Sequence, residues 1–260
     1  MSDRAFLLTL AYDGTDFAGW QRQRDTRTVQ GELERLLERL GDRPARVTGA
    51  GRTDAGVHAT GQAAGVVMPA SWTPATLKRA VNGLAPRDLW VQDAREVPTH
   101  LHPRYDALSR RYRYLLAVGE DGASPFRRRY EWHVRDPLDL AVLNAEAAVL
   151  IGDHGCRAFA VARTAPADDP HRCLIHRAAW REREGGLVFD IEANRFLHHM
   201  VRFLVGTMID VALGRRPAGT LAHLLTLDSN QETSAPAPAH GLYLEGVRYP
   251  AEKLELAVAA

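Results

Sequence analysis

The chain has 260 residues, and its 33 lysines and arginines against 32 aspartates and glutamates give a formal net charge of +1. Overall charge therefore gives no argument for a polyanionic partner, and the distribution of charge must decide. Two cysteines, Cys156 and Cys173, are too few for a disulfide framework, and no apolar run approaches the ~20 residues of a membrane span. Because the N-terminus lacks the pattern of a secretory signal, we expect a cytoplasmic protein with reduced thiols.

Strands and helices are predicted to alternate over the first hundred residues. Phe6, Leu8 and Leu10 alternate with other residues, which predicts a strand that ends at the turn signal Tyr12-Asp13-Gly14. Helical spacing of valine and leucine after a possible N-cap, Thr28, predicts a helix at 29–40. Further strands are predicted at 45–49, 62–68 and 89–97, and a helix that opens at Thr73-Pro74 reaches about Gly83.

The second part of the chain continues the mixture of strands and helices. Strands are predicted at 112–118, 177–183, 187–193 and 241–249, helices at 138–150, 196–213 and 221–227, and an exposed loop at 163–170. This order predicts an α+β protein with a mixed, largely antiparallel central sheet flanked by helices. We expect two similar-sized α/β halves, 1–105 and 106–260, with a cleft between them.

The glycine-rich stretch 49–58 is the most informative segment, because its three glycines permit tight turns and close approach of a ligand. It contains Arg52 and Asp54, and a carboxylate beside an arginine can stay ionised and act as a nucleophile or base. The alternative is that Asp54 only bonds to amides of its own turn. The stretch does not complete a dinucleotide-binding fingerprint, since the third glycine position holds Asp54. His198 and His199 are adjacent on a predicted helix and lack the spacing of zinc ligands, so no metal site is expected.

Several segments resemble the tRNA pseudouridine synthase A family in the same order along the chain. They run from about residue 6 to residue 250 and comprise Tyr12-Asp13-Gly14-Thr15, Gly19-Trp20-Gln21-Arg22-Gln23, Thr28-Val29-Gln30, Gly51-Arg52-Thr53-Asp54-Ala55-Gly56-Val57-His58, Arg110-Arg111-Tyr112-Arg113-Tyr114, Asn194-Arg195-Phe196-Leu197-His198-His199-Met200-Val201-Arg202 and Gly241-Leu242-Tyr243-Leu244. The resemblance implies a cofactor-free enzyme that isomerises uridines of the tRNA anticodon stem-loop, at tRNA positions 38–40, to pseudouridine.

The resemblance also implies a role for each matching residue. Asp54 becomes the catalytic carboxylate, and Tyr112 packs on the target uracil, although Tyr112 could instead fill the core as Tyr114 is expected to do. Arg202 pairs with Asp54, Arg52 helps to displace and hold the nucleotide, and Leu244 of the closing strand joins the substrate-binding set. The family implies a homodimer in which tRNA reaches across both subunits.

Two clusters of arginines could follow an RNA backbone, with Trp20 and Tyr112 among them as stacking aromatics. They are Arg22, Arg24, Arg27, Arg110, Arg111 and Arg113. Two other classes remain open: an RNA-binding protein without catalysis, against which Asp54 argues, and a nucleotide-binding oxidoreductase, against which the incomplete glycine pattern argues.

Overall fold

The computed structural model describes residues 3–161, 169 and 171–256, which lie in two compact units. Unit 1 comprises Met1–Ser109 and Leu244–Ala260, and unit 2 comprises Arg110–Tyr243. Strands and helices alternate in both units, and six of the seven strand pairs with a described register are antiparallel. The predicted α+β class with a mixed, largely antiparallel sheet is therefore confirmed. The division into folding halves at residue 105 stays a prediction.

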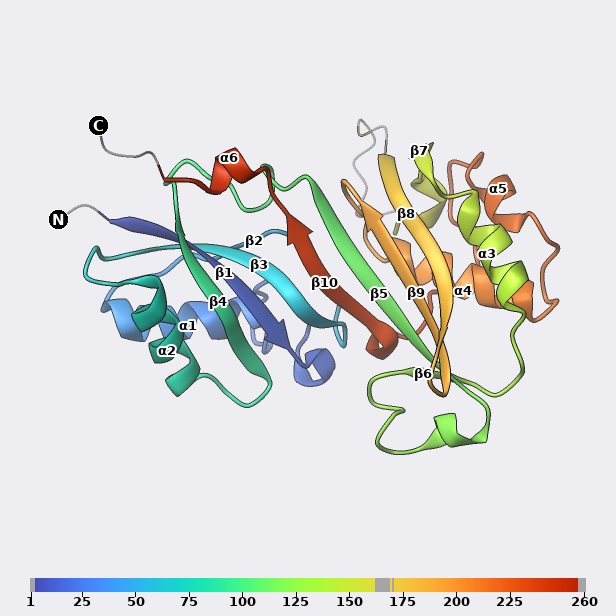
Figure 1. Cartoon of the computed structure of the whole chain (residues 1–260), viewed down its shortest axis with the longest axis horizontal. Helices are drawn as coiled ribbons and strands as arrows, with labels where there is room; N and C mark the ends of the chain where they lie inside the picture. The colour runs from blue at the N-terminus through green and yellow to red at the C-terminus, as the bar shows by residue number, and fades with distance from the viewer. Residues whose placement is uncertain (1–2, 162–168, 170, 257–260) are drawn as a thin grey trace. The chain divides into compact units, whose positions relative to one another are not determined.

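The sheet of unit 1 is built around its first strand, which pairs with antiparallel strands on both sides (Figure 1). In spatial order its strands are β4 (Leu89–Val97), β1 (Arg4–Tyr12), β3 (His58–Met68) and β10 (Leu242–Arg248), and the short β2 (Thr48–Gly49) also pairs with β3. Phe6, Leu8 and Leu10 are fully buried, as the alternation predicts. Ala5 and Leu7 on the opposite face are also buried, against a cluster that includes Leu101. Both faces of β1 are therefore covered.

Helices α1 (Val29–Gly41) and α2 (Pro74–Leu84) of unit 1 begin where the sequence predicts. The Thr28 hydroxyl accepts the amide proton of Gly31 at the start of α1. Thr73 caps α2 and completes a reciprocal capping box with Thr76. These caps satisfy amides that have no partner inside the helix, so each helix has a fixed first residue. A short helix, α6 (Ala251–Leu254), was not predicted.

In unit 2, three helices accompany the strands, and the first of them packs directly against strand β8 (Figure 1). The strands in spatial order are β5 (Ser109–Val118), β9 (Gly186–Ala193), β8 (Arg172–Arg183) and β7 (Gly152–Gly155), and β6 (Trp132–Val134) runs parallel to β5. The helices are α3 (Leu140–Ala148), α4 (Met200–Ala212) and α5 (Thr220–Leu224). Trp180 stacks on Phe189 at 5.0 Å and donates to the sulfur of Met208, which joins the sheet to α4.

Several predicted boundaries were wrong. Helix α4 begins at Met200 rather than at residue 196, because His199 has a left-handed backbone with φ of 63°. His198 and His199 therefore precede the helix instead of lying on it. Strands β3, β5 and β8 start three to five residues earlier than predicted, and β6 and β7 were missed. The predicted loop 163–170 lies, apart from residue 169, outside the described residues, and none of the described helices could cross a bilayer.

Candidate active site

Asp54 lies in unit 1, in the loop that joins β2 to β3, and the start of this loop is hydrogen-bonded to β3. The amide of Ala50 donates to the carbonyl of Ala63 at 2.8 Å. One residue further, the side chain of Gln62 accepts from the amide of Gly51 at 3.3 Å and donates to its carbonyl at 2.9 Å. Gln62 is fully buried, so an amide side chain continues the strand pairing for one more residue. The backbone of the loop therefore stops pairing with β3 after Gly51.

Thr53, the residue before Asp54, is fixed through both its side chain and its backbone. Its hydroxyl shares a buried 2.8 Å hydrogen bond with the hydroxyl of Tyr12, and its carbonyl accepts from the amide of Trp20 at 3.0 Å. Burial raises the pKa of Tyr12 far above its ordinary value, although hydrogen bonds from Thr53 and Gln62 oppose this. The phenol therefore stays neutral and acts as a structural anchor. The Cα position of Asp54 is set by these contacts.

A tight turn follows Asp54. The carbonyl of Asp54 accepts from the amide of Val57 at 3.2 Å, and Gly56 adopts a φ of 76°, which a side chain rarely allows. The amide of Gly56 donates to the carbonyl of Phe17 at 3.3 Å. Asp54 is half-buried, while Arg52 is exposed. The carboxylate thus sits on a stiff turn with part of its surface open to solvent.

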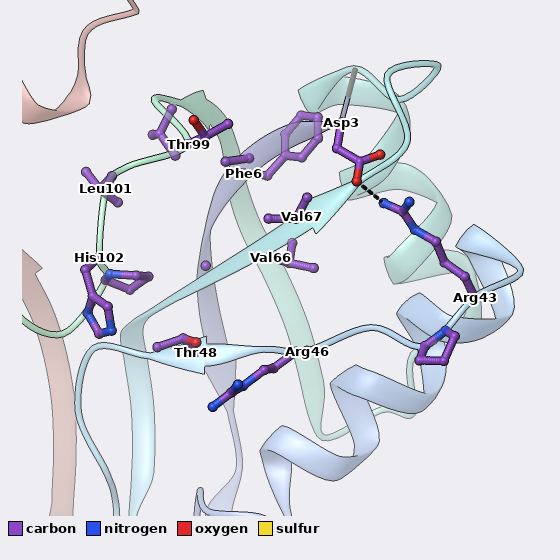
Figure 2. Close-up of a pocket in the computed structure, with 15 residues that line it drawn as sticks. Asp3, Phe6, Arg43, Arg46, Thr48, Val66, Val67, Thr99, Leu101 and His102 are labelled. Carbon is purple, nitrogen blue, oxygen red and sulfur yellow. Dashed lines mark ion pairs between the residues drawn. The ribbon is translucent and has the colours of Figure 1, made fainter. Parts of the chain in front are cut away.

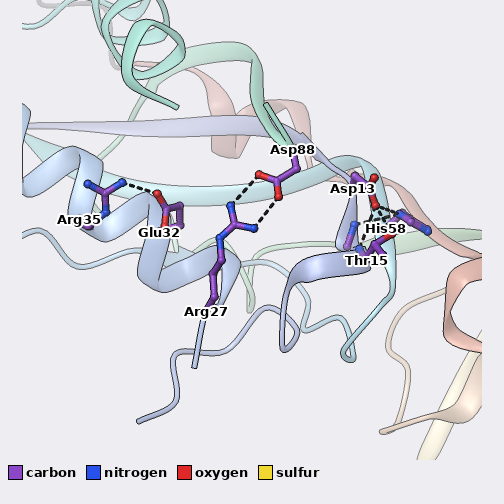
Figure 3. Close-up of polar contacts among 8 residues, drawn as sticks. Asp13, Thr15, Arg27, Glu32, Arg35, His58 and Asp88 are labelled. Atoms are coloured by element: carbon purple, nitrogen blue, oxygen red, sulfur yellow. Dashed lines mark hydrogen bonds and ion pairs between the residues drawn. The ribbon is translucent and has the colours of Figure 1, made fainter. Parts of the chain in front are cut away.

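The far end of the loop packs on the turn after β1, as Figure 3 shows. Nδ1 of the buried His58 accepts from the amide of Gly14 at 3.0 Å and lies 3.2 Å from a carboxylate oxygen of Asp13. Nδ1 of His58 therefore lies against both the backbone of Gly14 and the side chain of Asp13. A Cβ on Gly14 would lie 2.0 Å from the carbonyl oxygen of Val57. Only glycine fits this approach.

Much of the first predicted arginine cluster is used inside the fold. Arg27 makes two hydrogen bonds to Asp88, at 2.6 and 2.8 Å (Figure 3), and its guanidinium also lies 4.1 Å over the ring of Phe17. The hydrogen bonds with Asp88 raise the pKa of Arg27. Arg22 pairs with the buried carboxylate of Glu34 at 3.2 Å. Two arginines of this cluster are therefore paired with carboxylates of the same unit, which neutralise much of its positive charge.

The expected stacking role of Trp20 is wrong. Its side chain is only 2% exposed, and its ring lies where a Cβ on Gly49 would approach to 2.4 Å. The missing side chain of Gly49 makes room for the indole. Trp20 therefore supports the start of the Asp54 loop from inside the core and offers no face to a base.

Tyr112 and Arg202 lie in unit 2. Tyr112 is on β5 opposite Ile191 of β9, is 7% exposed, and meets the ring of Phe196 edge-on at 5.0 Å. Arg202 is on α4, and its Nε donates to the carbonyl of Ala237 at 2.7 Å, while the amide of Ala237 returns a hydrogen bond of 2.9 Å to the carbonyl of Arg202. The guanidinium is therefore held in one orientation by a backbone segment of its own unit.

Tyr114 and Leu244 complete the set of predicted residues. Tyr114 has no exposed surface and donates to the carbonyl of Pro238 at 2.7 Å, so its predicted place in the core is confirmed. Burial raises the pKa of Tyr114, and the charge of Arg202 opposes this. Leu244, on β10, is fully buried. Asp54 and Arg52 share one loop of unit 1, and the pairing of Asp54 with Arg202 stays a prediction.

Unit 1 also contains a pocket of about 500 Å³, whose lining residues are drawn in Figure 2. Its wall includes Phe6, Val66 and Leu101, and an ion pair of 2.9 Å between Arg43 and Asp3 closes one side. None of the residues 49–58 contributes to the wall. The pocket is therefore separate from the candidate active site.

Comparison with known proteins relates these features to one family. The model of the family described as tRNA pseudouridine synthase matches residues 9–106 and 147–250. The tRNA pseudouridine synthase A of Thermus thermophilus is 42% identical over 254 residues, which are 96% of this chain and 99% of the relative. That of Halalkalibacterium halodurans is 41% identical over 236 residues, 90% and 89% of the two chains. Since both matches span nearly all of the fold, the chain belongs to the tRNA pseudouridine synthase family.

Proposed function

We propose that this chain isomerises uridines in the anticodon stem-loop of tRNA to pseudouridine and that Asp54 is its catalytic carboxylate. The observation that carries the proposal is the fixed geometry of the Asp54 loop in a chain of this family. Gln62 and Tyr12 hold the residues before Asp54, and a glycine turn holds those after it. A half-buried carboxylate on a stiff turn is suited to meet a nucleotide taken out of its stack.

The reaction conserves the atoms of the nucleoside. The bond from N1 of uracil to C1′ of ribose breaks, and a bond from C5 to C1′ forms. The hydrogen on C5 leaves to water, and N1 takes up a proton, so neither an oxidant nor a group donor is required. An ionised aspartate can begin this exchange at the sugar or at the base, and we leave its covalent partner open.

The other site residues support the carboxylate and the target nucleotide. We assign to Arg202 the pairing that keeps Asp54 ionised and aimed, since a cation nearby favours the charged form. Tyr112 packs on the flipped uracil, and Leu244 contacts it from the closing strand. The exposed Arg52 holds a phosphate of the displaced nucleotide and so offsets the few kcal/mol that base extraction costs.

We further propose a cytoplasmic homodimer that modifies tRNA positions 38–40. A dimer doubles each local basic patch, which helps a chain of net charge +1 to bind a polyanion. Sedimentation of the purified chain, alone and with tRNA, measures this assembly. Tight tRNA binding by a chain that remains monomeric would refute the proposed dimer.

Tritium release tests the chemistry directly. The substrate is tRNA labelled with tritium at C5 of uracil, and we expect release by the wild type and none by Asp54→Asn, with tRNA still bound by both. Asp93→Asn, which changes an exposed carboxylate on β4, serves as the matched control and should release tritium normally. Equal release from Asp54→Asn and wild type would contradict the role of Asp54. Binding without release by the wild type would indicate a non-catalytic RNA-binding protein.

A further inference from the structure

A surface turn of unit 2 exposes an aromatic ring beside two arginines. This segment, residues 124–130 between β5 and β6, is called the Phe126 loop and contains the run Phe126-Arg127-Arg128-Arg129-Tyr130. Phe126 is 88% exposed, and Arg128 and Arg129 are also exposed. A phenylalanine placed almost wholly in water has no packing role in the chain itself, which makes it a candidate for contact with a ligand.

Backbone hydrogen bonds form two successive turns in the Phe126 loop. The carbonyl of Ser124 accepts from the amides of Arg127 and Arg128, both at 3.0 Å. The carbonyl of Arg127 accepts from the amides of Tyr130 at 2.8 Å and Glu131 at 3.0 Å. These successive turns fix the loop, so little conformational entropy remains to be lost when a ligand binds.

The first arginine of the run anchors the loop to the β8–β9 hairpin. Arg127 donates to the carboxylate of Glu131 at 2.6 Å and to the carbonyl of Gly185 at 2.9 Å, and Arg183 donates to Glu131 at 2.9 Å. Burial acts to raise the pKa of Glu131, but the hydrogen bonds from the two arginines outweigh it and hold the pKa below its ordinary value. Glu131 is therefore charged and fully engaged.

The next two arginines are exposed on the surface of the loop. Arg128 has no ion pair among the described residues, and Arg129 lies 5.7 Å over the ring of Tyr130. Guanidinium groups bind phosphate oxygens, and an exposed ring stacks on any unpaired base. A second copy of this loop is a poor partner, because it would bring like charges together.

From these contacts we propose that the Phe126 loop is a second tRNA contact, in which Phe126 stacks on an unpaired base while Arg128 and Arg129 bind the adjoining phosphates. The inference rests on the proposed function only in taking tRNA as the ligand. The loop holds the RNA and takes no part in bond breaking. It is expected to govern affinity and the Michaelis constant and to leave kcat unchanged.

Binding of tRNA, measured over a range of salt concentrations, tests the proposal. Phe126→Ala should weaken binding by about 5- to 150-fold, the loss of one stacked base, and Phe126→Trp should retain it. Arg128→Ala with Arg129→Ala should lower the slope of log affinity against log salt by about 1.4 to 1.8, the value for two phosphates. The control pair is Arg215→Ala with Arg216→Ala, which removes the same charge beyond α4 and should change the slope less.

The outcomes separate this proposal from the others. An affinity within twofold of wild type in Phe126→Ala, together with an unchanged salt slope in the Arg128/Arg129 variant, would overturn it. A fall in oligomeric state on sedimentation of Phe126→Ala, with unchanged tRNA binding per assembled protein, would instead make the loop a protein contact and also overturn it. If the wild type binds tRNA but releases no tritium, the proposed function fails. The binding measurements on the variants would still decide whether the Phe126 loop contacts tRNA.

Discussion

The hydrogen bond between Tyr12 and Thr53 makes a quantitative prediction about the stiffness of the Asp54 loop. Both hydroxyls are buried and lie 2.8 Å apart, although their residues are 41 positions apart in the chain. Tyr12→Phe deletes one hydroxyl and leaves that of Thr53 buried without its partner. Thr53→Val deletes the other, but the phenol keeps its contact with Gln62. The tyrosine variant should therefore be the less stable of the two.

The expected size follows from the burial of the orphaned group. Leaving one buried partner unsatisfied costs about 1–3 kcal/mol, whereas replacing both partners by apolar groups of the same shape is close to neutral. For a chain of this length that cost lowers the melting temperature by about 2–4 °C per kcal/mol. The double variant, Tyr12→Phe with Thr53→Val, should be more stable than the sum of the single losses by about 0.5–3 kcal/mol.

Thermal unfolding of the wild type, both single variants and the double variant gives this coupling. Tritium release from tRNA, measured alongside, should show a lower kcat with little change in KM, because the carboxylate next to Thr53 loses its fixed position. Strictly additive losses of stability would refute the reasoning, since they would mean that the two hydroxyls act independently. Reduced stability with normal kcat would show that the bond supports the fold and not the loop.

Three further predictions concern close packing, thiols and pH. Gly14→Ala, which places a Cβ 2.0 Å from a carbonyl oxygen, should lower the melting temperature sharply, whereas Gly83→Ala has open space on α2 and should be stabilising by about 0.5–1 kcal/mol. The buried thiols of Cys156 and Cys173 should stay unreactive towards Ellman's reagent until the protein unfolds, and rapid native-state reaction would contradict their burial. The pKa of Glu131 is lower in the folded protein than its ordinary value. The charged carboxylate therefore stabilises the fold at any pH above that ordinary pKa, and this stabilisation is lost as the pH falls through the folded pKa. Urea titrations should show this acid loss in wild type and less of it in Glu131→Gln.

Local signals in the sequence were sufficient for most elements of the fold. Thr28 and Thr73 mark the helix starts because their hydroxyls cap amides only a few residues away. Strand β4 was predicted at its observed bounds, and the hairpin of β8 and β9 turns next to Gly185-Gly186, as the glycine pair indicates. Each of these features depends on interactions between near neighbours in the chain.

Boundaries set by distant contacts could not be predicted in this way. Strand β8 extends back to Arg172 because β7, a short strand with no apolar alternation, pairs with it. The start of α4 is delayed by the left-handed His199, a conformation that is uncommon outside glycine and that the apolar pattern of the helix does not indicate. The Phe126 loop has a clear basic and aromatic sequence, but only the structure distinguishes the arginine that anchors it from the two that face water.

The same distinction applies to the Asp54 loop. The glycine-rich run with its one carboxylate was enough to predict Asp54 as the catalytic residue. The side chains that stiffen the loop, however, come from distant strands, Tyr12 from β1 and Gln62 from β3. Gln62 is a polar residue inside an apolar strand pattern, and its burial is tolerated because both ends of its amide are bonded to Gly51. A polar residue inside an apolar stretch of a strand is therefore a signal that the sequence offers, since an unpaired buried amide there would cost several kcal/mol. We therefore expect Gln62→Leu, which keeps the volume but removes both bonds to Gly51 and the contact with Tyr12, to preserve β3 while releasing Gly51. Tritium release should then show a clear fall in kcat, while thermal unfolding shows a small fall in the melting temperature.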